Sequence, residues 1–250
     1  MSLSTYRTRI TAVLDRIWTS QAANIERAAL AMADAIHAGG LVHLFGSGHS
    51  VLPVQDVFPR YGSYPGFRPL MDARLMWTNV IGSGGAKGLL WLERREGYAP
   101  VLFENEPIRK GDVMLVFSHG GLNAVGIEVA LEARARGLAT VAVTSLDNAR
   151  RREATHSSGK KLADVADIVI DNCVPAEDAL VPIPGWAAPV AAGSTVASVT
   201  IAMALVAEVA SRLAALGAAP PVFVSPNVPG VAPDTNTQVF AAYERSLRRD

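Results

Sequence analysis

Apolar residues recur at steps of three and four along the first part of the chain. The positions that follow this spacing, with charged residues between them, are Ile10, Val13, Leu14, Ile17, Ile25, Ala28, Ala29, Met32 and Ile36. The pattern predicts one long amphipathic helix, or two, over residues 4–37, ended by Gly39-Gly40. Because this length exceeds what a compact α/β core needs to cover one face of its sheet, we expect part of it to pack on another subunit.

Continuous apolar runs alternate with helical patterns through the rest of the chain. Runs that predict buried strands lie at residues 41–45, 113–117, 139–143 and 167–170, with a shorter strand near 68–71. Helices are predicted at 51–60, 86–97, 123–136, 160–165, 196–216 and 237–248, and a loop at 171–192. Ser194 and Thr195 stand where an N-cap belongs. This alternation predicts an α/β fold with a parallel sheet of about five strands and helices on both faces.

The first predicted strand runs directly into a small polar turn. The sequence from 41 to 50 is LVHLFGSGHS, in which Gly46 and Gly48 allow a tight turn and a close approach of a ligand to the backbone. Backbone N–H groups and the hydroxyls of Ser47 and Ser50 can converge on a phosphate there, helped by the following helix dipole. A glycine turn is also the ordinary way to leave a parallel sheet, so this motif alone leaves both interpretations open.

A second strand repeats this design. The sequence from 111 to 121 is GDVMLVFSHGG, in which the strand ends in Ser118, His119, Gly120 and Gly121 before a helix. Ligands of open α/β sheets bind outside the carboxyl ends of the strands, so we expect both turns to open on the same edge of the sheet.

Composition and charge narrow the function classes. Lys plus Arg and Asp plus Glu are equal at 23 each, so nucleic-acid or membrane-surface binding has no electrostatic support. The N-terminus lacks the apolar core of a signal peptide, and the apolar stretch at 196–209 is shorter than a bilayer span and interrupted by Glu208. The single Cys173 excludes an internal disulfide and a cysteine-based metal cluster.

These observations predict a cytoplasmic protein of one domain. Within the 250 residues we expect a helical extension at 1–40, an α/β core at 41–216, and an extended tail with a final helix at 217–250.

Three segments resemble the SIS (sugar isomerase) domain family. They are GSGHS at 46–50, FSHGGLNAVGIEVALEARARGLATVAVTS at 117–145, and LADVADIVID at 162–171. The middle segment is the most specific, because it combines a small polar turn, a helix with acidic and alanine positions, and a strand that ends in Thr144-Ser145. The segments HSSGKKLADVADIVIDNCVPAEDA and PPVFVSPNVPG further resemble a phosphosugar-binding branch with chains of this length.

The resemblance implies a three-layer α/β/α sandwich with a five-stranded parallel sheet and a phosphorylated sugar as ligand. By position, the ligand contacts implied are Gly46, Ser47, Gly48, Ser50, Ser118, His119, Gly120, Gly121, Thr144 and Ser145. It also implies a homodimer or dimer of dimers with the site near the interface, and this agrees with the overlong N-terminal helix. The implied activity is aldose–ketose isomerisation of a sugar phosphate, and phosphosugar lyases, deaminating enzymes and non-catalytic sensors stay open as alternatives.

Isomerisation of a sugar phosphate needs a base that moves a proton between neighbouring carbons. His49 in the first turn and His156 in a later loop are candidate bases at the predicted ligand edge, and Glu177 offers a carboxylate after the last strand. His43, inside the first strand, is predicted to be structural.

The chain departs from the family pattern near these candidates. Many members carry a glutamate on the helix after the first turn, where residues 51–60 offer only Gln55 and Asp56. Several use a histidine late in the chain, and none follows His156. The resemblance therefore does not identify which residue acts as the base.

No metal or other cofactor is predicted. The five histidines lack the HxxxH and HxH spacings of a helix or strand metal site. His49, His119 and His156 would form one only if their separate loops converge, which we keep as a hypothesis. No Walker sequence or GxGxxG spacing indicates a nucleotide.

Overall fold

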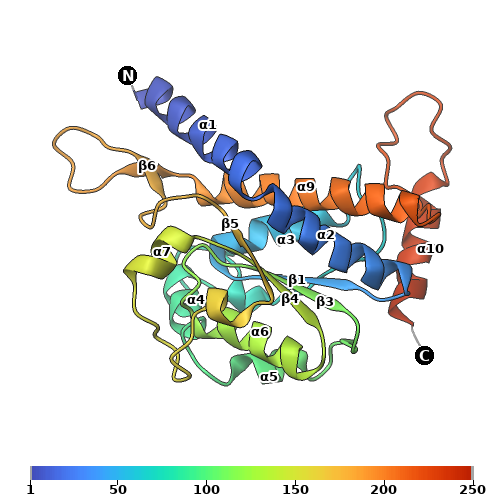
Figure 1. Cartoon of the computed structure of the whole chain (residues 1–250), viewed down its shortest axis with the longest axis horizontal. Helices are drawn as coiled ribbons and strands as arrows, with labels where there is room; N and C mark the ends of the chain where they lie inside the picture. Colours follow the sequence, from blue (N-terminus) through green and yellow to red (C-terminus); the bar gives the residue numbers. More distant parts are fainter. Residues whose placement is uncertain (1, 249–250) are drawn as a thin grey trace.

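A five-stranded parallel sheet forms the centre of the protein, in the order β2-β1-β3-β4-β5. The computed structural model describes residues 2–248 (Figure 1). The strands are β1 (Val42–Gly46), β2 (Phe67–Pro69), β3 (Val113–Phe117), β4 (Ala139–Thr144) and β5 (Ile168–Asp171). This arrangement confirms the predicted α/β class and the parallel sheet.

Helices cover both faces of the sheet, so the predicted three-layer sandwich is also confirmed. They are α1 (Ser2–Ser20), α2 (Ala22–His37), α3 (Val51–Val57), α4 (Ala86–Leu92), α5 (Tyr98–Phe103), α6 (Ala124–Ala135), α7 (Leu146–Arg151), α8 (Leu162–Val165), α9 (Ser194–Ala215) and α10 (Thr235–Leu247). Figure 1 shows α2 and α9 on one side of the sheet and α5 and α6 on the other.

The continuous apolar strands are buried on both sides because alternate residues enter different layers. Leu44 and Leu115, paired across β1 and β3, pack with α2, α3 and α9. Their neighbours Phe45 and Val116 pack with α5, α6 and α8 on the opposite face. Full burial of one such side chain stabilises the fold by roughly 1.5–3 kcal/mol.

The N-terminal helical pattern forms two helices separated by a bend at Gln21. In α2, Ala28, Ala29 and Met32 are completely buried, so the apolar side of this helix packs against the sheet, as its periodicity predicted. In α1 only Val13 and Ile17 are buried, and the helix projects beyond the sheet (Figure 1).

The predicted loop at 171–192 contains a hairpin that the sequence pattern did not indicate. Its strands, β6 (Ala179–Val181) and β7 (Val190–Ala192), form a separate antiparallel pair. Asp178, just before β6, accepts hydrogen bonds from the N–H groups of Gly193 and Ser194 and from the Ser194 hydroxyl. Because Asp178 satisfies these N–H groups, α9 begins at Ser194 and not at the predicted position 196.

α9 is longer than the apolar stretch considered in the sequence. By length and composition alone it could cross a membrane, and it is the one helix of which this holds within residues 2–248. Its Ala197, Ile201, Leu205 and Val209 are buried in the layer that α2 and α3 share. Packing as a core helix therefore accounts for its apolar composition.

A buried histidine–aspartate contact joins the amino ends of β1 and β3. His43 Nε2 lies 2.8 Å from Asp112 Oδ2, and both side chains are buried. Asp112 also accepts hydrogen bonds from the N–H groups of Leu41 and Arg109. His43 thus takes part in a structural contact, at the end of β1 opposite its glycine turn.

Replacing Asp112 by Ala should lower the free energy of unfolding by about 3–5 kcal/mol, because His43 and two backbone N–H groups lose a buried partner. Urea denaturation followed by circular dichroism measures this loss. The exposed Asp15→Ala should change stability by no more than about 0.5 kcal/mol. Equal free energies of unfolding for D112A and D15A would show that the buried contact does not stabilise the fold.

Candidate functional site

The chain leaves β1 and β3 toward opposite faces of the sheet. α3, which follows β1, packs in the layer of α2 and α9, whereas α6, which follows β3, packs in the other layer. Neighbouring strands whose connections diverge in this way leave a crevice at their carboxyl ends, which is where open α/β sheets bind ligands. We call residues 46–50 loop 1 and residues 118–123 loop 2, and these two loops border the crevice.

Loop 1 is a tight turn that requires glycine. A Cβ atom at Gly46 would lie 2.1 Å from the carbonyl oxygen of Ser50, so no other residue fits there. The Ser50 N–H donates to the Ser47 carbonyl, and residues 48–50 form one turn of 3₁₀ helix before α3. The turn places Ser47 and Ser50 at the end of β1, and the convergence of their hydroxyls on a phosphate stays a prediction.

Loop 2 is held by its own hydrogen bonds and by contacts with the end of β4 and with α7. Gly121 has φ +63°, and a Cβ there would lie 2.7 Å from Thr144 Oγ1. The Asn148 side chain donates to the Gly120 carbonyl, and the Ser118 hydroxyl accepts from the Gly121 N–H. Packing and hydrogen bonds on the β4 side therefore fix the conformation of loop 2.

Two predicted ligand contacts, Thr144 and Ser145, lie behind loop 2 and are completely buried. The Thr144 hydroxyl donates to the His119 carbonyl, and the Ser145 hydroxyl donates to the Val174 carbonyl. Their contact with a sugar stays a prediction, and the structure gives both a part in shaping loop 2.

His119 is fixed on one side only. Its Nδ1 lies 3.1 Å from the side-chain nitrogen of the buried Asn172. Its Nε2 is buried and has no hydrogen-bond partner. A buried ring nitrogen without a partner is suited to a polar ligand atom.

The two loops are joined by a residue that sequence reasoning missed, Glu93 at the end of α4. Glu93 is 5% exposed, and its Oε2 accepts a hydrogen bond of 2.8 Å from the Ser47 hydroxyl of loop 1. Its carboxylate also hydrogen-bonds the Asn123 side chain of loop 2. Burial raises the pKa of Glu93, and the Ser47 hydrogen bond opposes that shift.

No local signal in the sequence marks Glu93. It stands in the charged stretch ERRE, which is typical of a solvated helix end, and its partners lie 46 residues before it and 30 after it.

A small cavity of about 200 Å³ opens beside loop 1. Gly48, His49, Gln55 and Trp77 contribute to its lining. The rings of His49 and Trp77 lie 5.1 Å apart, and the buried Trp77 Nε1 has no hydrogen-bond partner. The cavity thus combines an imidazole, an amide and a free indole N–H, a set that suits a polyhydroxylated ligand.

The other predicted catalytic residues have different surroundings. Glu177 lies in the exposed loop before β6, where its carboxylate is 3.3 Å from Arg151. His156 lies against Glu96 and Glu128. The hypothesis that His49, His119 and His156 converge is not supported: the one group of metal-type ligands in the described residues contains only His156 of the three.

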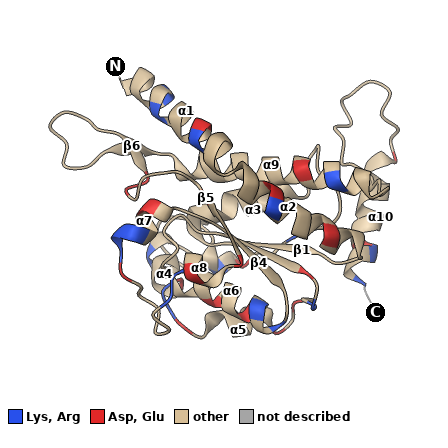
Figure 2. Cartoon of the chain, in the orientation of Figure 1, with Lys and Arg blue, Asp and Glu red and all other residues tan. Residues whose placement is uncertain are grey.

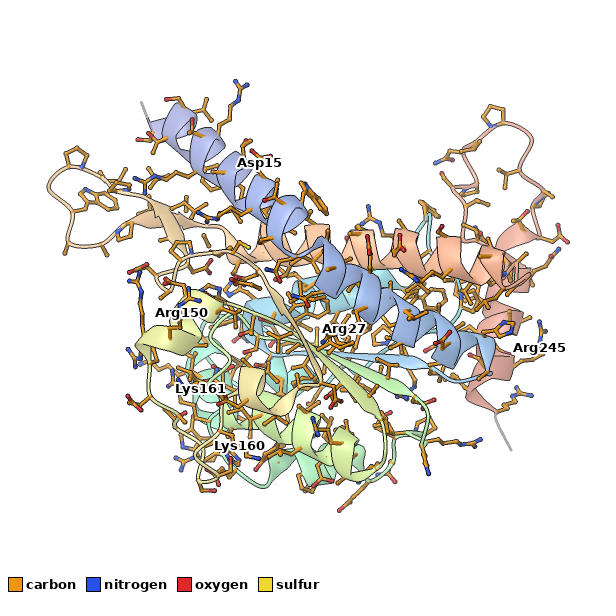
Figure 3. All side chains as sticks on the ribbon, in the orientation of Figure 1. Asp15, Arg27, Arg150, Lys160, Lys161 and Arg245 are labelled. Atoms are coloured by element: carbon orange, nitrogen blue, oxygen red, sulfur yellow. The ribbon has the colours of Figure 1, made fainter. Side chains whose placement is uncertain are left out.

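A second cavity, of about 540 Å³, lies between α1, α7 and the end of β5. Arg9 and Arg16 of α1 line it together with Arg150 of α7. Figure 2 shows basic residues gathered at α7, and Figure 3 shows Arg150 on α7. Arg9 and Arg16 also donate to the carbonyls of Leu180 and Cys173, which anchors α1 to this region.

A sequence profile of the SIS domain matches residues 5–145, which include both loops and Glu93. The chain belongs to the SIS domain family. The resemblance found in loop 1 and loop 2 is thereby confirmed.

Relatives extend the match over nearly the whole chain. The UPF0309 protein of Geobacillus thermodenitrificans (strain NG80-2) is 36% identical over 224 residues, 90% of this chain and 88% of the relative. A UPF0309 protein of Oceanobacillus iheyensis is 33% identical over 242 residues, 97% of this chain and 96% of the relative.

Solved structures share the SIS fold at low sequence identity. A phosphoheptose isomerase from Neisseria gonorrhoeae aligns with a TM-score of 0.56 at 15% identity, covering 84% of this chain and 97% of that one. A phosphoheptose isomerase from Francisella tularensis aligns with a TM-score of 0.55 at 17% identity, covering 83% and 95%. These likenesses establish the arrangement of the sheet and its helices.

The raised pKa of Glu93 predicts a pH-dependent difference between wild type and Glu93→Gln. The pKa of Glu93 is higher in the folded state than in the unfolded state, so the folded protein keeps this proton to higher pH. As pH rises from the ordinary glutamate pKa through the raised one, wild type should therefore lose stability relative to E93Q. Urea denaturation across this range measures the difference.

Ser47→Ala provides the matched comparison. The Ser47 hydrogen bond lowers the Glu93 pKa, so S47A should raise that pKa further. The loss of stability that Glu93 causes relative to Gln at this position should then continue to higher pH in the S47A background. A stability difference between wild type and E93Q that does not change with pH would contradict the assignment.

Proposed function

We propose that this protein binds a phosphorylated sugar between loop 1 and loop 2 and interconverts its aldose and ketose forms through an enediolate. The observation that carries the proposal is Glu93, a buried carboxylate that hydrogen-bonds Ser47 and Asn123 and so ties the two loops together at the sheet edge. The phosphoheptose isomerases that share the fold carry names of this substrate class.

The phosphate is assigned to the amino-terminal end of α6 and the hydroxyls of the loops. α6 has 12 residues, and its first N–H groups follow loop 2 directly. A helix of this length attracts an anion at its amino end. Ser50 and Ser118 supply hydroxyl donors from the two sides of the crevice.

The proton transfer is assigned to His49. Its exposed ring borders the cavity that contains Trp77 and Gln55, next to loop 1. An imidazole there removes the proton from the carbon beside the carbonyl and returns it to the former carbonyl carbon, while backbone N–H groups of the loops stabilise the enediolate. The hydroxyl proton passes from the one oxygen of the enediolate to the other, which completes the exchange of the two groups. Glu93 acts as a positioning residue that sets the distance between the loops.

The paired variant Ser50→Ala/Ser118→Ala should weaken sugar-phosphate binding by roughly 1–3 kcal/mol for each lost donor. Thermal shifts with aldose, ketose and amino-sugar phosphates, beside the unphosphorylated sugars, measure this. Ser211→Ala, on the exposed side of α9, is the control. Unchanged binding in a folded double variant would refute the phosphate assignment.

His49→Gln should keep phosphate-ester binding and lose exchange of the sugar's α-proton into deuterated water. Exchange followed by NMR separates the alternatives. Wild-type binding without exchange would indicate a sensor, and exchange accompanied by loss of a leaving group would indicate a lyase or deaminating enzyme. Full exchange in H49Q would move the base to another residue, with His156 and Glu177 as the remaining candidates.

We also infer that two copies associate through α1 and the β6–β7 hairpin. Both elements project beyond the sheet on the same side (Figure 1). Leu3 of α1 is 84% exposed and Trp186 of the hairpin 67%, an unusual placement for large apolar side chains.

Wild type should sediment as a dimer, and Trp186→Glu should shift it toward the monomer because a charge would be buried in the contact. Trp91→Glu, an exposed tryptophan on α4, is the matched control and should leave the dimer intact. Sedimentation velocity distinguishes these outcomes. A monomeric wild type, or dissociation by W91E alone, would contradict the proposed contact.

A further inference from the structure

Three segments meet beside α6, which follows loop 2. Glu96 comes from the connection between α4 and α5, Glu128 from α6, and His156 from the loop between α7 and α8. His156 Nε2 lies 3.7 Å from Glu128 Oε1 and 3.9 Å from Glu96 Oε2. One ligand atom from each residue lies within 4.8 Å of the other two.

The imidazole nitrogen directed at these carboxylates has no hydrogen-bond partner. The His156 side chain is only 7% exposed, and its buried Nε2 makes no hydrogen bond. Within residues 2–248 neither carboxylate forms an ion pair with Lys or Arg. Within residues 2–248, two acidic groups and an unsatisfied ring nitrogen therefore face one another with no Lys or Arg paired to them.

The nearby lysines do not supply that cation. Lys160 and Lys161 precede α8 on the same loop as His156 (Figure 3). Lys161 Nζ donates to the Ala149 carbonyl, which directs it toward α7.

We propose that Glu96, Glu128 and His156 form a site for a divalent transition-metal ion, with Zn²⁺ the best match. One imidazole nitrogen and two carboxylate oxygens are ligands that zinc accepts in tetrahedral geometry at about 2.0–2.2 Å. Ligand atoms at that distance are separated by roughly 3.4 Å in a tetrahedron, so the 3.7 and 3.9 Å from Nε2 to the two carboxylates require only a small contraction. The carboxylate oxygens of Glu96 and Glu128 lie within 4.8 Å of each other and move together on binding. The Glu96 side chain is 40% exposed, which leaves a fourth position open to water.

The carboxylates are held in place before any ion binds. Glu128 accepts the N–H groups of Gly97, Tyr98 and Ala99 at the start of α5. Glu96 accepts the N–H and hydroxyl of Ser157, next to His156. Such contacts orient metal ligands and reduce the reorganisation that binding needs.

Ser158 is the positioning residue for the imidazole. His156 Nδ1 lies 2.8 Å from the Ser158 hydroxyl and 3.1 Å from the Ser158 N–H. In this structure Nδ1 accepts the Ser158 N–H. Coordination through Nε2 moves the ring proton to Nδ1, so that bond is exchanged for one in which Nδ1–H donates to the Ser158 hydroxyl oxygen.

An ion here would also stiffen the neighbourhood of loop 2. The Thr155 hydroxyl, one residue before His156, donates to the Leu122 carbonyl within loop 2. A metal that fixes His156 against Glu128 would therefore hold this loop against the start of α6. The inference does not depend on the identity of the sugar.

The test is a titration of the untagged, metal-stripped full chain with Zn²⁺ alone. Calorimetry gives stoichiometry and affinity, and elemental analysis after gel filtration confirms the retained ion. Co²⁺ in place of Zn²⁺ reports coordination geometry through its visible absorption. No sugar phosphate is added, so failure here and failure of the proposed isomerase activity are independent results.

Two ligand variants and one positioning variant are compared with two controls. His156→Gln and Glu96→Gln each remove one ligand and spare the α5 contacts of Glu128. Ser158→Ala removes the outer partner of the ring. Glu153→Gln, on the same loop, and His37→Gln, on α2, are the controls, and circular dichroism checks that every variant folds.

We expect one Zn²⁺ per chain in wild type and in both controls. Binding should be lost in H156Q and E96Q and weakened roughly 10–100-fold in S158A. The proposal is overturned if wild type binds no stoichiometric ion or if folded H156Q and E96Q bind as tightly as wild type.

Discussion

The divergence of the chain after β1 and β3 is the constraint on which the candidate site depends. The two strands pair along their whole length, yet α3 and α6 lie on opposite faces of the sheet. Loop 1 and loop 2 must therefore separate at the carboxyl edge, and no strand fills the space between them. Side chains refine this crevice, but its position follows from strand order.

Buried carboxylates secure both ends of this strand pair. Asp112 holds the amino ends through His43 and two backbone N–H groups, and Glu93 holds the loops at the carboxyl ends through Ser47 and Asn123. Burying a carboxylate is unfavourable unless hydrogen bonds offset its desolvation. The donors found at both positions provide that offset, and in doing so they fix the spacing of β1, β3 and their loops.

Much of the sheet could be predicted from sequence because its information is local. The apolar run at 113–117 corresponds to β3 residue for residue, and loop 1 and loop 2 follow their strands as expected. The β6–β7 hairpin was missed because each strand has three residues and Asp178 and Ala191 adopt positive φ without being glycine. α7 was missed because six residues rich in charge have no detectable period.

The candidate site was harder to predict because its chemistry depends on residues far apart in sequence. His49 and His156 both stand in small polar loops, and only their surroundings distinguish them. His49 borders a cavity that contains an indole N–H without a partner, which favours an organic ligand. His156 faces two carboxylates to which no basic side chain of the described residues is paired, which favours a cation. The same residue type in similar loops thus points to different ligands, because the charge and polarity around each imidazole determine which species can bind there.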